Sequence, residues 1–365
     1  MIGVYIHIPF CVRKCLYCDF VSYVRTEEIQ KAYIDRLVEE IEDCPVSETV
    51  DTVFIGGGTP SVLSFGEIGR VMDALRRKFV FAQDCECSIE VNPGTVDLKK
   101  MSAYREYGIN RLSIGLQSWD DTQLKTLGRI HTCEEFEKTF WLAREAGFDN
   151  VNVDLMSAIP GQTRQSYAET LQKVLSLAPE HISAYSLIVE EGTPFAHMEL
   201  DLPQEEEERE MYYDTKRILS EAGYDRYEIS NYAKKGFACR HNVGYWTGKE
   251  YLGFGVAAAS FYQGMRMRNQ SSLEDYLEKG PSLEEKVMLT KEDMMSEFFF
   301  VGLRMMKGVS ERAFEERFSE RFEERFGNVI RKHMDSGLLV KDEGFLCLTE
   351  KGIDVSNYVL CDFVL

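Results

Sequence analysis

The sequence lacks any run of apolar residues long enough to cross a lipid bilayer, so we do not expect an integral membrane protein. The first residues show no basic segment followed by a short apolar one, and we expect no secretory signal there. The sequence also has fewer basic than acidic residues, with 42 lysines and arginines against 61 aspartates and glutamates, which gives a formal net charge of −19. Nucleic acids and anionic membranes bind cationic surfaces, so this balance argues against both as main partners.

Histidine is scarce, with six residues in 365, and no two histidines stand at a metal-ligand spacing. Cysteine is not scarce, with ten residues. Without a secretory signal, this number indicates a reducing, cytoplasmic location, where cysteines bind metals, react or are buried more often than they form disulfides. No low-complexity linker or internal repeat divides the chain, and its length suits a large α/β barrel with an appended domain.

Three of the cysteines, Cys11, Cys15 and Cys18, lie within eight residues, directly after an apolar segment. Cysteine thiolates are the usual protein ligands of iron–sulfur clusters, and three without a nearby fourth suit a cluster that keeps one metal position free. Structural zinc with a remote fourth ligand is the alternative. Zinc sites usually pair one short cysteine spacing with a second pair downstream, and Cys85 and Cys87 are too close together for that role.

Short apolar runs alternate with longer amphipathic ones over the first two-thirds of the chain. This alternation predicts parallel strands joined by right-handed crossovers, and six units predict an α/β fold with a partial (β/α)6 barrel of the TIM type, open on one side. The expected strands are residues 3–8, 52–55, 87–91, 111–114, 151–155 and 182–188. The expected helices between them are residues 26–43, 65–79, 98–107, 122–127, 133–146 and 164–177.

Glycines and polar residues follow these predicted strands, where the functional loops of such barrels lie. The first strand leads into the cysteine segment and the second into the glycine-rich segment 56–61. The next three strand ends carry Glu90, Gln117 and Asp154. For any one of these residues, capping of a loop is as good an interpretation as ligand binding. Five strand ends that all carry such residues favour one shared binding site.

The spacing CxxxCxxC after a first strand, with an aromatic residue before the last cysteine, resembles the radical S-adenosylmethionine (SAM) enzymes. Residues 5–10 are similar to the branch that contains oxygen-independent coproporphyrinogen III oxidase and the heme chaperones named HemW. The resemblance implies that Cys11, Cys15 and Cys18 hold three irons of a [4Fe–4S] cluster, whose fourth iron chelates SAM. It also implies that one electron from a low-potential donor cleaves SAM to a 5′-deoxyadenosyl radical.

The same resemblance implies a set of SAM ligands. In chain order they are Tyr5, Tyr17, Gly57, Gly58, Thr59, Glu90, Gln117, Arg129 and Asp154. Tyr5 matches a tyrosine that contacts the SAM carboxylate or the cluster edge, and Tyr17 matches a position whose backbone meets adenine. The two glycines and the threonine match the motif that holds the methionine amino group, and the last four residues match polar SAM ligands. On its own, Arg129 would be interpreted as a surface arginine.

The oxidases carry a fourth cysteine two residues beyond the third, and Phe20 stands at that position here. The chain therefore looks more like the heme chaperones. This implies a protein that binds heme and delivers it to acceptor hemoproteins such as cytochromes, free or membrane-bound, using its cluster and SAM. The alternatives are an enzyme that oxidatively decarboxylates the propionates of coproporphyrinogen III, and a radical SAM methylase or heme-degrading enzyme of the same branch.

Residues 227–260 are rich in aromatic residues and glycine, as the wall of a site for a large flat ligand would be. From residue chemistry alone, His241 is better interpreted as a core histidine among packed aromatic rings. The HNxxYW motif of the heme chaperones is matched by His241, Asn242, Tyr245 and Trp246. That match implies that His241 ligates the heme iron and that the aromatic residues pack the ring, with Cys239 as the second candidate for the iron ligand.

We expect three regions: a radical SAM barrel with the cluster and SAM at 1–225, the HNxxYW region and a connector at 226–280, and a winged-helix-like α+β domain at 281–365. In the last region we expect helices at 285–306, 311–318 and 327–336, and a hairpin at 337–349. Acidic residues in the expected wing favour a docking or lid role over DNA binding. Phenylalanines recur every four residues from 314 to 326, which is typical of one apolar helix face in a core.

Overall fold

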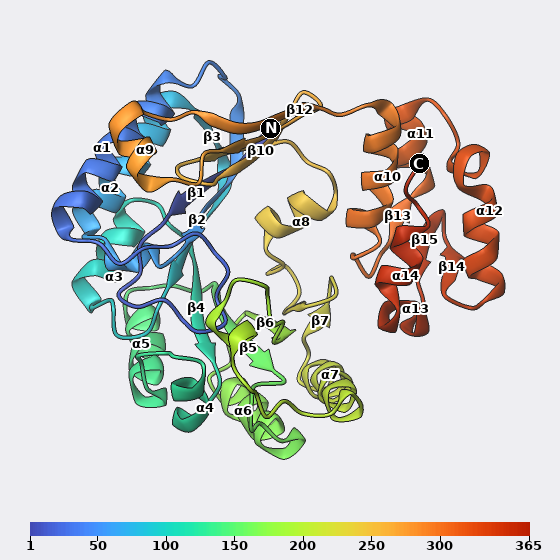
Figure 1. Cartoon of the computed structure of the whole chain (residues 1–365), viewed down its shortest axis with the longest axis horizontal. Coiled ribbons are helices and arrows are strands. Elements are labelled where there is room, and N and C mark those ends of the chain that lie inside the picture. The colour runs from blue at the N-terminus through green and yellow to red at the C-terminus, as the bar shows by residue number, and fades with distance from the viewer.

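Six parallel strands form the centre of the computed structural model, which describes all 365 residues (Figure 1). They are β1 (Ile2–Ile8), β2 (Thr49–Gly57), β3 (Val80–Val91), β4 (Arg111–Gln117), β5 (Val151–Ser157) and β6 (His181–Ser186). The strands follow one another across the sheet in chain order, as right-handed crossovers require. The predicted partial barrel is therefore confirmed, although β3 begins seven residues before its predicted start because its first half also pairs with β2.

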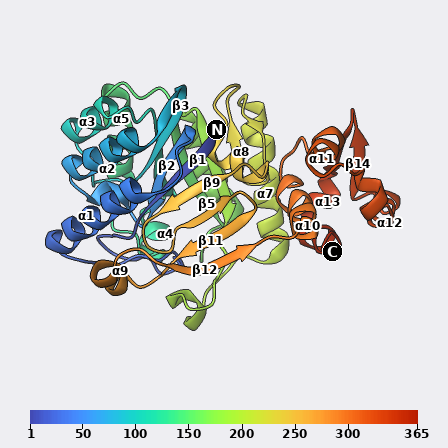
Figure 2. The same ribbon diagram turned by 90° about the horizontal axis from the view of Figure 1, so that it is seen from above.

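Helices connect these strands and cover the outer face of the sheet (Figures 1 and 2). They are α1 (Glu27–Asp43), the short η1 (Pro60–Val62), α2 (Phe65–Lys78), α3 (Leu98–Glu106), α4 (Asp121–Thr126), α5 (Cys133–Glu145) and α6 (Arg164–Ser176). Ser64, Thr132 and Thr163 cap α2, α5 and α6, each accepting a hydrogen bond from the backbone N–H three residues on. After β6 come η2 (Pro194–His197) and α7 (Glu205–Glu221).

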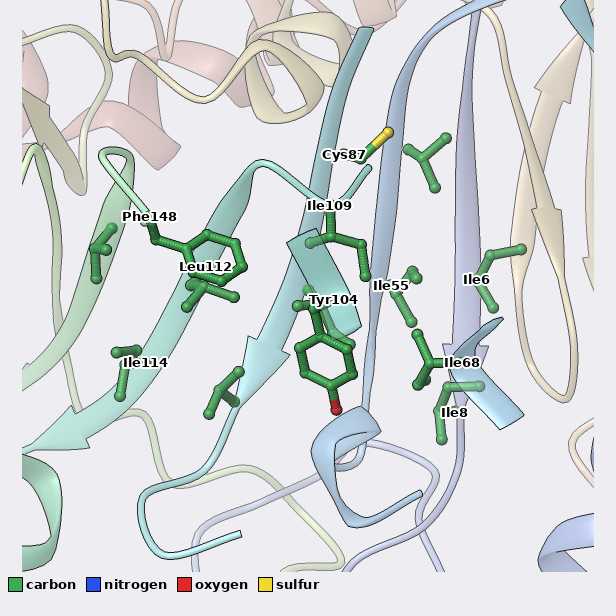
Figure 3. Packing of buried hydrophobic residues seen from close by; sticks show 14 of the residues in the cluster. Ile6, Ile8, Ile55, Ile68, Cys87, Tyr104, Ile109, Leu112, Ile114 and Phe148 are labelled. Atoms are coloured by element: carbon green, nitrogen blue, oxygen red, sulfur yellow. The ribbon is translucent and has the colours of Figure 1, made fainter. Parts of the chain in front are cut away.

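The core of this unit lies between the sheet and its helices. Along β1 the isoleucines and Val4 point outward into the core, while Tyr5 and His7 face the interior of the partial barrel. Ile6 and Ile8 lie near Ile55 of the next strand and Ile68 of α2 (Figure 3). The cluster has 52 buried residues, enough to hold the strand ends in fixed positions.

Later segments extend the sheet at both edges. Beyond β6 lie β8 (Asn231–Ala233) and β7 (Asp225–Arg226), and beyond β1 lie β9 (Tyr251–Phe254), β10 (Ala259–Tyr262), β11 (Met265–Asn269) and β12 (Leu283–Met288). β9 runs parallel to β1, and the next three strands are antiparallel. The helices α8 (Arg240–Trp246) and α9 (Leu273–Lys279) lie in this part. The boundaries predicted at 225 and 280 stay a prediction.

The helix predicted at 285–306 is wrong in its first part. Residues 283–288 form β12 because they pair with β11, and the sequence pattern of these residues does not predict that pairing. The helix α10 (Lys291–Gly302) begins after Thr290, whose side chain accepts a hydrogen bond from the Asp293 N–H at 3.1 Å.

The C-terminal domain has its own core and lies at one end of the molecule, where Lys216 of α7 pairs with its Glu350 (Figure 1). After α10 its elements are β13 (Val309–Ser310), α11 (Glu311–Phe318), α12 (Phe322–Asp335), β14 (Leu339–Asp342), β15 (Phe345–Leu348), α13 (Glu350–Asp354) and α14 (Ser356–Cys361). The order of helices followed by a hairpin, with β13 paired to β15, is that of a winged helix, as predicted.

The four regularly spaced phenylalanines of this domain do not lie on one helix. The left-handed Ser319, with a φ of 57°, ends α11, and α12 starts three residues later. Phe314 and Phe318 on one helix and Phe322 and Phe326 on the next are all buried in the same cluster. They are core residues, as expected, and rings from the two helices pack against each other. None of the helices in the chain has the length and apolar character needed to span a membrane.

Candidate functional site

Two cavities lie next to each other in the molecule. The first, of about 490 Å³, opens at the carboxyl ends of the parallel strands and is lined by the three cysteines that follow β1; we call it the cysteine cavity. The second, of about 800 Å³, lies between the β9–β11 side of the sheet with α8 and the C-terminal domain; we call it the interdomain cavity. Asp19 and Phe20, just after the last of these cysteines, line both.

The cysteine cavity brings together eight of the nine residues predicted to bind SAM. They are Tyr17, Gly57, Gly58, Thr59, Glu90, Gln117, Arg129 and Asp154. Tyr5 lies elsewhere: it lines the interdomain cavity, and its hydroxyl is 3.1 Å from His7 Nδ1. That Tyr5 contacts SAM or the cluster edge stays a prediction, and the roles of the other eight are supported so far by their convergence.

The loop that follows β1 presents three free thiols, those of Cys11, Cys15 and Cys18, to the cysteine cavity. A Cβ atom at Gly58 would lie 2.8 Å from the Phe10 carbonyl oxygen and 3.1 Å from Cys11 Sγ, so only glycine lets the end of β2 approach this loop so closely. No group of acidic, histidine or cysteine side chains converges on a single-ion position. Thiolates that bind separate irons of a cluster need no such convergence.

Hydrogen-bond donors face the thiols. Arg129 Nη1 donates to Cys15 Sγ at 3.8 Å, and the Thr59 hydroxyl is 3.4 Å from Cys11 Sγ. These donors stabilise thiolate charge, so the residues present fit a cluster held by three thiolates. When bound, a [4Fe–4S] cluster of this kind supplies one electron and an open iron position for SAM. What this chain contributes is the placing of the thiolates and the donors around them.

Arg129 is a structural link in the cavity wall and not a surface arginine. Its Nη2 donates to the Gly115 carbonyl oxygen at 2.6 Å and to Asn92 Oδ1 at 3.0 Å. Asn92 in turn donates to Thr59 Oγ1 at 2.9 Å. The chain of contacts ties three strand ends to the cysteine loop. Sequence reasoning did not assign a role to Asn92, although its place just after the third strand was the available signal.

Gln117 is aimed into the cavity by an irregular backbone. Its φ of 73° is unusual for a residue other than glycine, and the pairing of β4 with β5 shifts register between Gly115 and Gln117. The hydroxyl of Tyr185 donates to Gln117 Oε1 at 2.9 Å. Tyr185, on β6, is a second cavity residue that the sequence did not single out, because alternation alone does not say which of its strand neighbours face inward.

Two carboxyl groups give the cavity its electrostatic character. Asp154 accepts hydrogen bonds from Ser113 at 3.2 Å and Asn152 at 2.8 Å, and burial raises its pKa. The Gly57 N–H donates to Glu90 Oε2 at 3.1 Å. Burial, together with the nearby Asp154, raises the pKa of Glu90 to about 8. A cationic ligand placed against these groups would favour their ionised forms.

The HNxxYW segment forms α8 and separates the two cavities. Asn242 lines the cysteine cavity, while Tyr245 and Trp246 line the interdomain cavity. Cys239 lines neither; it is fully buried and its Sγ donates to Glu86 Oε1 at 3.6 Å. The predicted aromatic residues therefore face a large cavity.

His241 lies behind Tyr245 as seen from the interdomain cavity. Its Nε2 is 2.9 Å from the Tyr245 hydroxyl and its Nδ1 is 3.0 Å from Thr52 Oγ1. The imidazole is buried, with 3% exposure, and stacks on Phe54 with ring centroids 5.4 Å apart. Burial lowers the pKa of His241 to about 3, so the ring is neutral. Both nitrogens are engaged, and ligation of an iron by His241 requires the Tyr245 phenol to move.

Replacing Cys15 with alanine is expected to abolish iron–sulfur cluster assembly in a chain that still folds, since this half-exposed thiol packs into no core. Iron and sulfide content and the cluster absorbance after anaerobic reconstitution measure the loss, and circular dichroism measures folding. Cys361→Ala, which removes an exposed thiol far along the chain, is the matched control and should keep its cluster. An unchanged iron content in Cys15→Ala would show that the cysteine motif has been misassigned.

SAM binding is expected to release a proton near neutral pH, because the raised pKa of Glu90 leaves its carboxyl protonated until a cation arrives. Affinity should then rise with pH, by up to about tenfold per pH unit, and level off above pH 8. Calorimetry in buffers of different ionisation enthalpy counts the proton. Glu90→Gln should remove this release, while Glu106→Gln, on exposed α3 surface, should retain it. Equal proton release from Glu90→Gln would rule out Glu90 as its source.

Comparison with known proteins agrees with this geometry. The radical SAM superfamily matches residues 5–174, and the HemN C-terminal domain matches residues 289–355. The heme chaperone HemW of Bacillus subtilis is 36% identical over 377 residues, covering 100% of this chain and 99% of that protein. HemW of Lactococcus lactis is 35% identical over 368 residues, covering 99% and 97%.

A solved structure agrees with these matches in fold. Coproporphyrinogen III oxidase (HemN) from Escherichia coli, described as a radical SAM enzyme, superposes with a TM-score of 0.86 at 27% identity, covering 99% of this chain and 89% of that one. The superfamily implies SAM and a [4Fe–4S] cluster, for which the three cysteines and the cavity around them provide the place. The chain belongs to the radical SAM superfamily and, within it, to the family of the heme chaperones HemW.

Proposed function

We propose that this protein is a heme chaperone that binds heme in the interdomain cavity and delivers it to acceptor hemoproteins in the cytoplasm or at its membrane, cytochromes among them. The observation that carries the proposal is the 800 Å³ cavity with Tyr245 and Trp246 of the HNxxYW segment on its wall. The relatives named heme chaperone HemW, similar over the full length of the chain, support the same reading.

The interdomain cavity suits a large, flat and mainly apolar ligand. Its volume lies within the range of small-molecule sites, and 16 of its 28 lining residues are hydrophobic, so a porphyrin ring would be mostly removed from water. The barrel side contributes an aromatic group: Tyr5, Tyr245, Trp246, Tyr251 and Phe261. Such rings offer both stacking faces and edges to a macrocycle.

A heme in this cavity would lie beside the cluster loop. Phe20 lines both cavities and is 63% exposed, so its ring is available to a ligand in either of them. Because Phe20 is two residues from Cys18, loading of the cluster or of SAM would change the shape of a wall that heme also contacts. This adjacency gives the cluster and SAM a physical route to influence heme binding or release.

Two anaerobic assays of the reconstituted protein test the proposed function. In the first, heme-loaded protein is mixed with an apo-hemoprotein and heme transfer is followed by absorbance; we expect transfer to the acceptor. In the second, the protein receives SAM, a strong reductant and coproporphyrinogen III, and products are separated by chromatography; we expect no protoporphyrinogen. Many turnovers to protoporphyrinogen would make the protein an oxidase in spite of Phe20 and overturn the proposal.

We propose His241 as the axial ligand of the heme iron, reached when the Tyr245 phenol moves aside. His241→Ala should weaken heme binding and alter the Soret spectrum without affecting SAM affinity. Tyr245→Phe removes only the hydroxyl that holds Nε2, so it should preserve or tighten heme binding. Optical and electron paramagnetic resonance spectra of both heme-loaded variants identify the axial ligand of the iron. If Tyr245→Phe loses the ligand signature and His241→Ala keeps it, the phenol is the ligand instead.

A further inference from the structure

The interdomain cavity has a cationic wall in a protein whose net charge is −19. Its acidic lining residues are Asp19 and Glu297, and its cationic ones are Lys249, Arg266, Lys307 and Arg317. Two of the four cations are neutralised by the protein itself. Lys249 forms an ion pair with Asp51, and Arg266 pairs with Glu297 at 3.0 Å.

The remaining two cations, Lys307 and Arg317, form no ion pair and donate no side-chain hydrogen bond within the chain, although Glu297 and Glu250 lie near enough to Arg317 to favour its charged form. Both belong to the C-terminal domain: Lys307 precedes β13, and Arg317 lies near the end of α11. The Lys307 ammonium lies over the ring of Phe345, 4.5 Å from its centroid. Arg317 reaches toward the barrel, where a Cβ built on Gly248 would lie 2.7 Å from its Nη1. One unpaired surface lysine would carry little meaning, but these two come from separate elements and line one cavity.

We propose that Lys307 and Arg317 bind the two propionate carboxylates of heme, so that the C-terminal domain supplies the charged half of the heme site. The inference rests on the proposed function and deepens it. Most of the aromatic lining residues come from the barrel side, while both free cations come from the opposite wall, together with Phe298 and Phe345. An amphiphilic dicarboxylate matches both walls at once, because carboxylates form their strongest hydrogen bonds with guanidinium and ammonium groups.

The number of free cations also bears on which tetrapyrrole fits. Heme carries two propionates and coproporphyrinogen III carries four. A cavity with two unpaired cations can neutralise the first ligand, but it would leave two carboxylates of the second without a partner and partly removed from water, which is costly. The charge pattern thus favours heme over the substrate of the oxidases by a criterion independent of Phe20.

A heme held in this way joins the two domains. Only residues 289 and 290 separate β12 from α10, so the C-terminal domain is linked to the sheet by a short connection next to the cavity. Moving this domain away from the barrel would separate the cations from the aromatic wall and expose the ligand.

The test compares heme with its dimethyl ester, which has the same ring and iron but no carboxylate charge. Affinities of both are measured by titration for the full-length protein and for the variants Lys307→Met, Arg317→Met and the double variant. Methionine keeps much of the side-chain length and removes the charge. Arg312→Met is the matched control, because Arg312 is exposed on the same helix as Arg317 and pairs with Glu316 at 2.7 Å outside the cavity.

We expect each single variant to lose about tenfold in heme affinity, and the double variant more, while the ester binds all of them within about twofold of the parent. Arg312→Met should bind both ligands like the parent. Equal heme affinity in the parent and the double variant would overturn the proposal, as would an equal loss for heme and its ester, which would mark the two residues as parts of the cavity shape only. A parent protein that binds neither ligand would instead overturn the heme chaperone function itself.

Discussion

Both cavities depend on the pairing of β1 along its two edges. On one edge β1 pairs in parallel with β2, with Ile8 opposite Gly57, and this places the cysteine loop against the glycine-rich end of β2. On the other edge it pairs in parallel with β9, with Tyr5 opposite Gly253, and this brings the segment after α8 to the barrel. One strand therefore carries the cysteines at its end and joins the two walls between which the cavities form.

The inward side chains of this region form a continuous aromatic layer behind the cavities. Tyr5 stacks on Phe54 with ring centroids 6.4 Å apart, and Phe54 stacks on His241. Tyr245 meets both His241 and Tyr251 edge to face. Because a packed layer of this kind has few alternative arrangements, a shift of Tyr245 to free His241 would be felt at Tyr5. Tyr5 in turn lies close enough to Glu90 of the cysteine cavity for the two side chains to interact electrostatically. The layer thus couples the two cavities physically, as the shared Phe20 does at the surface.

The sequence was informative wherever one local rule was sufficient. Parallel strands end at the same edge of a sheet, so residues near the carboxyl ends of these strands, such as Glu90 on β3 and Asp154 on β5, were expected to converge, and they do. Arg129 was placed only through family resemblance, because its burial depends on a loop that folds back onto Cys15. The position of Tyr5 on the interdomain cavity could not be foreseen for a related reason: β9, almost 250 residues further along, forms part of its surroundings, and its contact with SAM or the cluster edge stays a prediction.

Long-range pairing also explains the other differences. The partners of His241 include Thr52, 189 positions away, so no pattern around the HNxxYW motif reveals that both of its nitrogens are engaged. β12 exists because β11 lies beside it, and the same six residues in isolation carry no strand pattern. The interdomain cavity could not be predicted from the sequence for the same reason, since its walls come from parts of the chain as far apart as Tyr5 and Arg317.

The central claim, that heme occupies the interdomain cavity and not the cysteine cavity, is tested most directly by locating iron in crystals of the heme-loaded, cluster-bearing protein. Anomalous scattering at the iron edge would give two separate peaks. We expect one at Cys11, Cys15 and Cys18 and a second between α8 and the C-terminal domain, beside Tyr245. A second peak inside the cysteine cavity, against Glu90 and Gln117, would contradict the account. Heme would then lie where the substrate of an enzyme would be expected, beside SAM and the cluster.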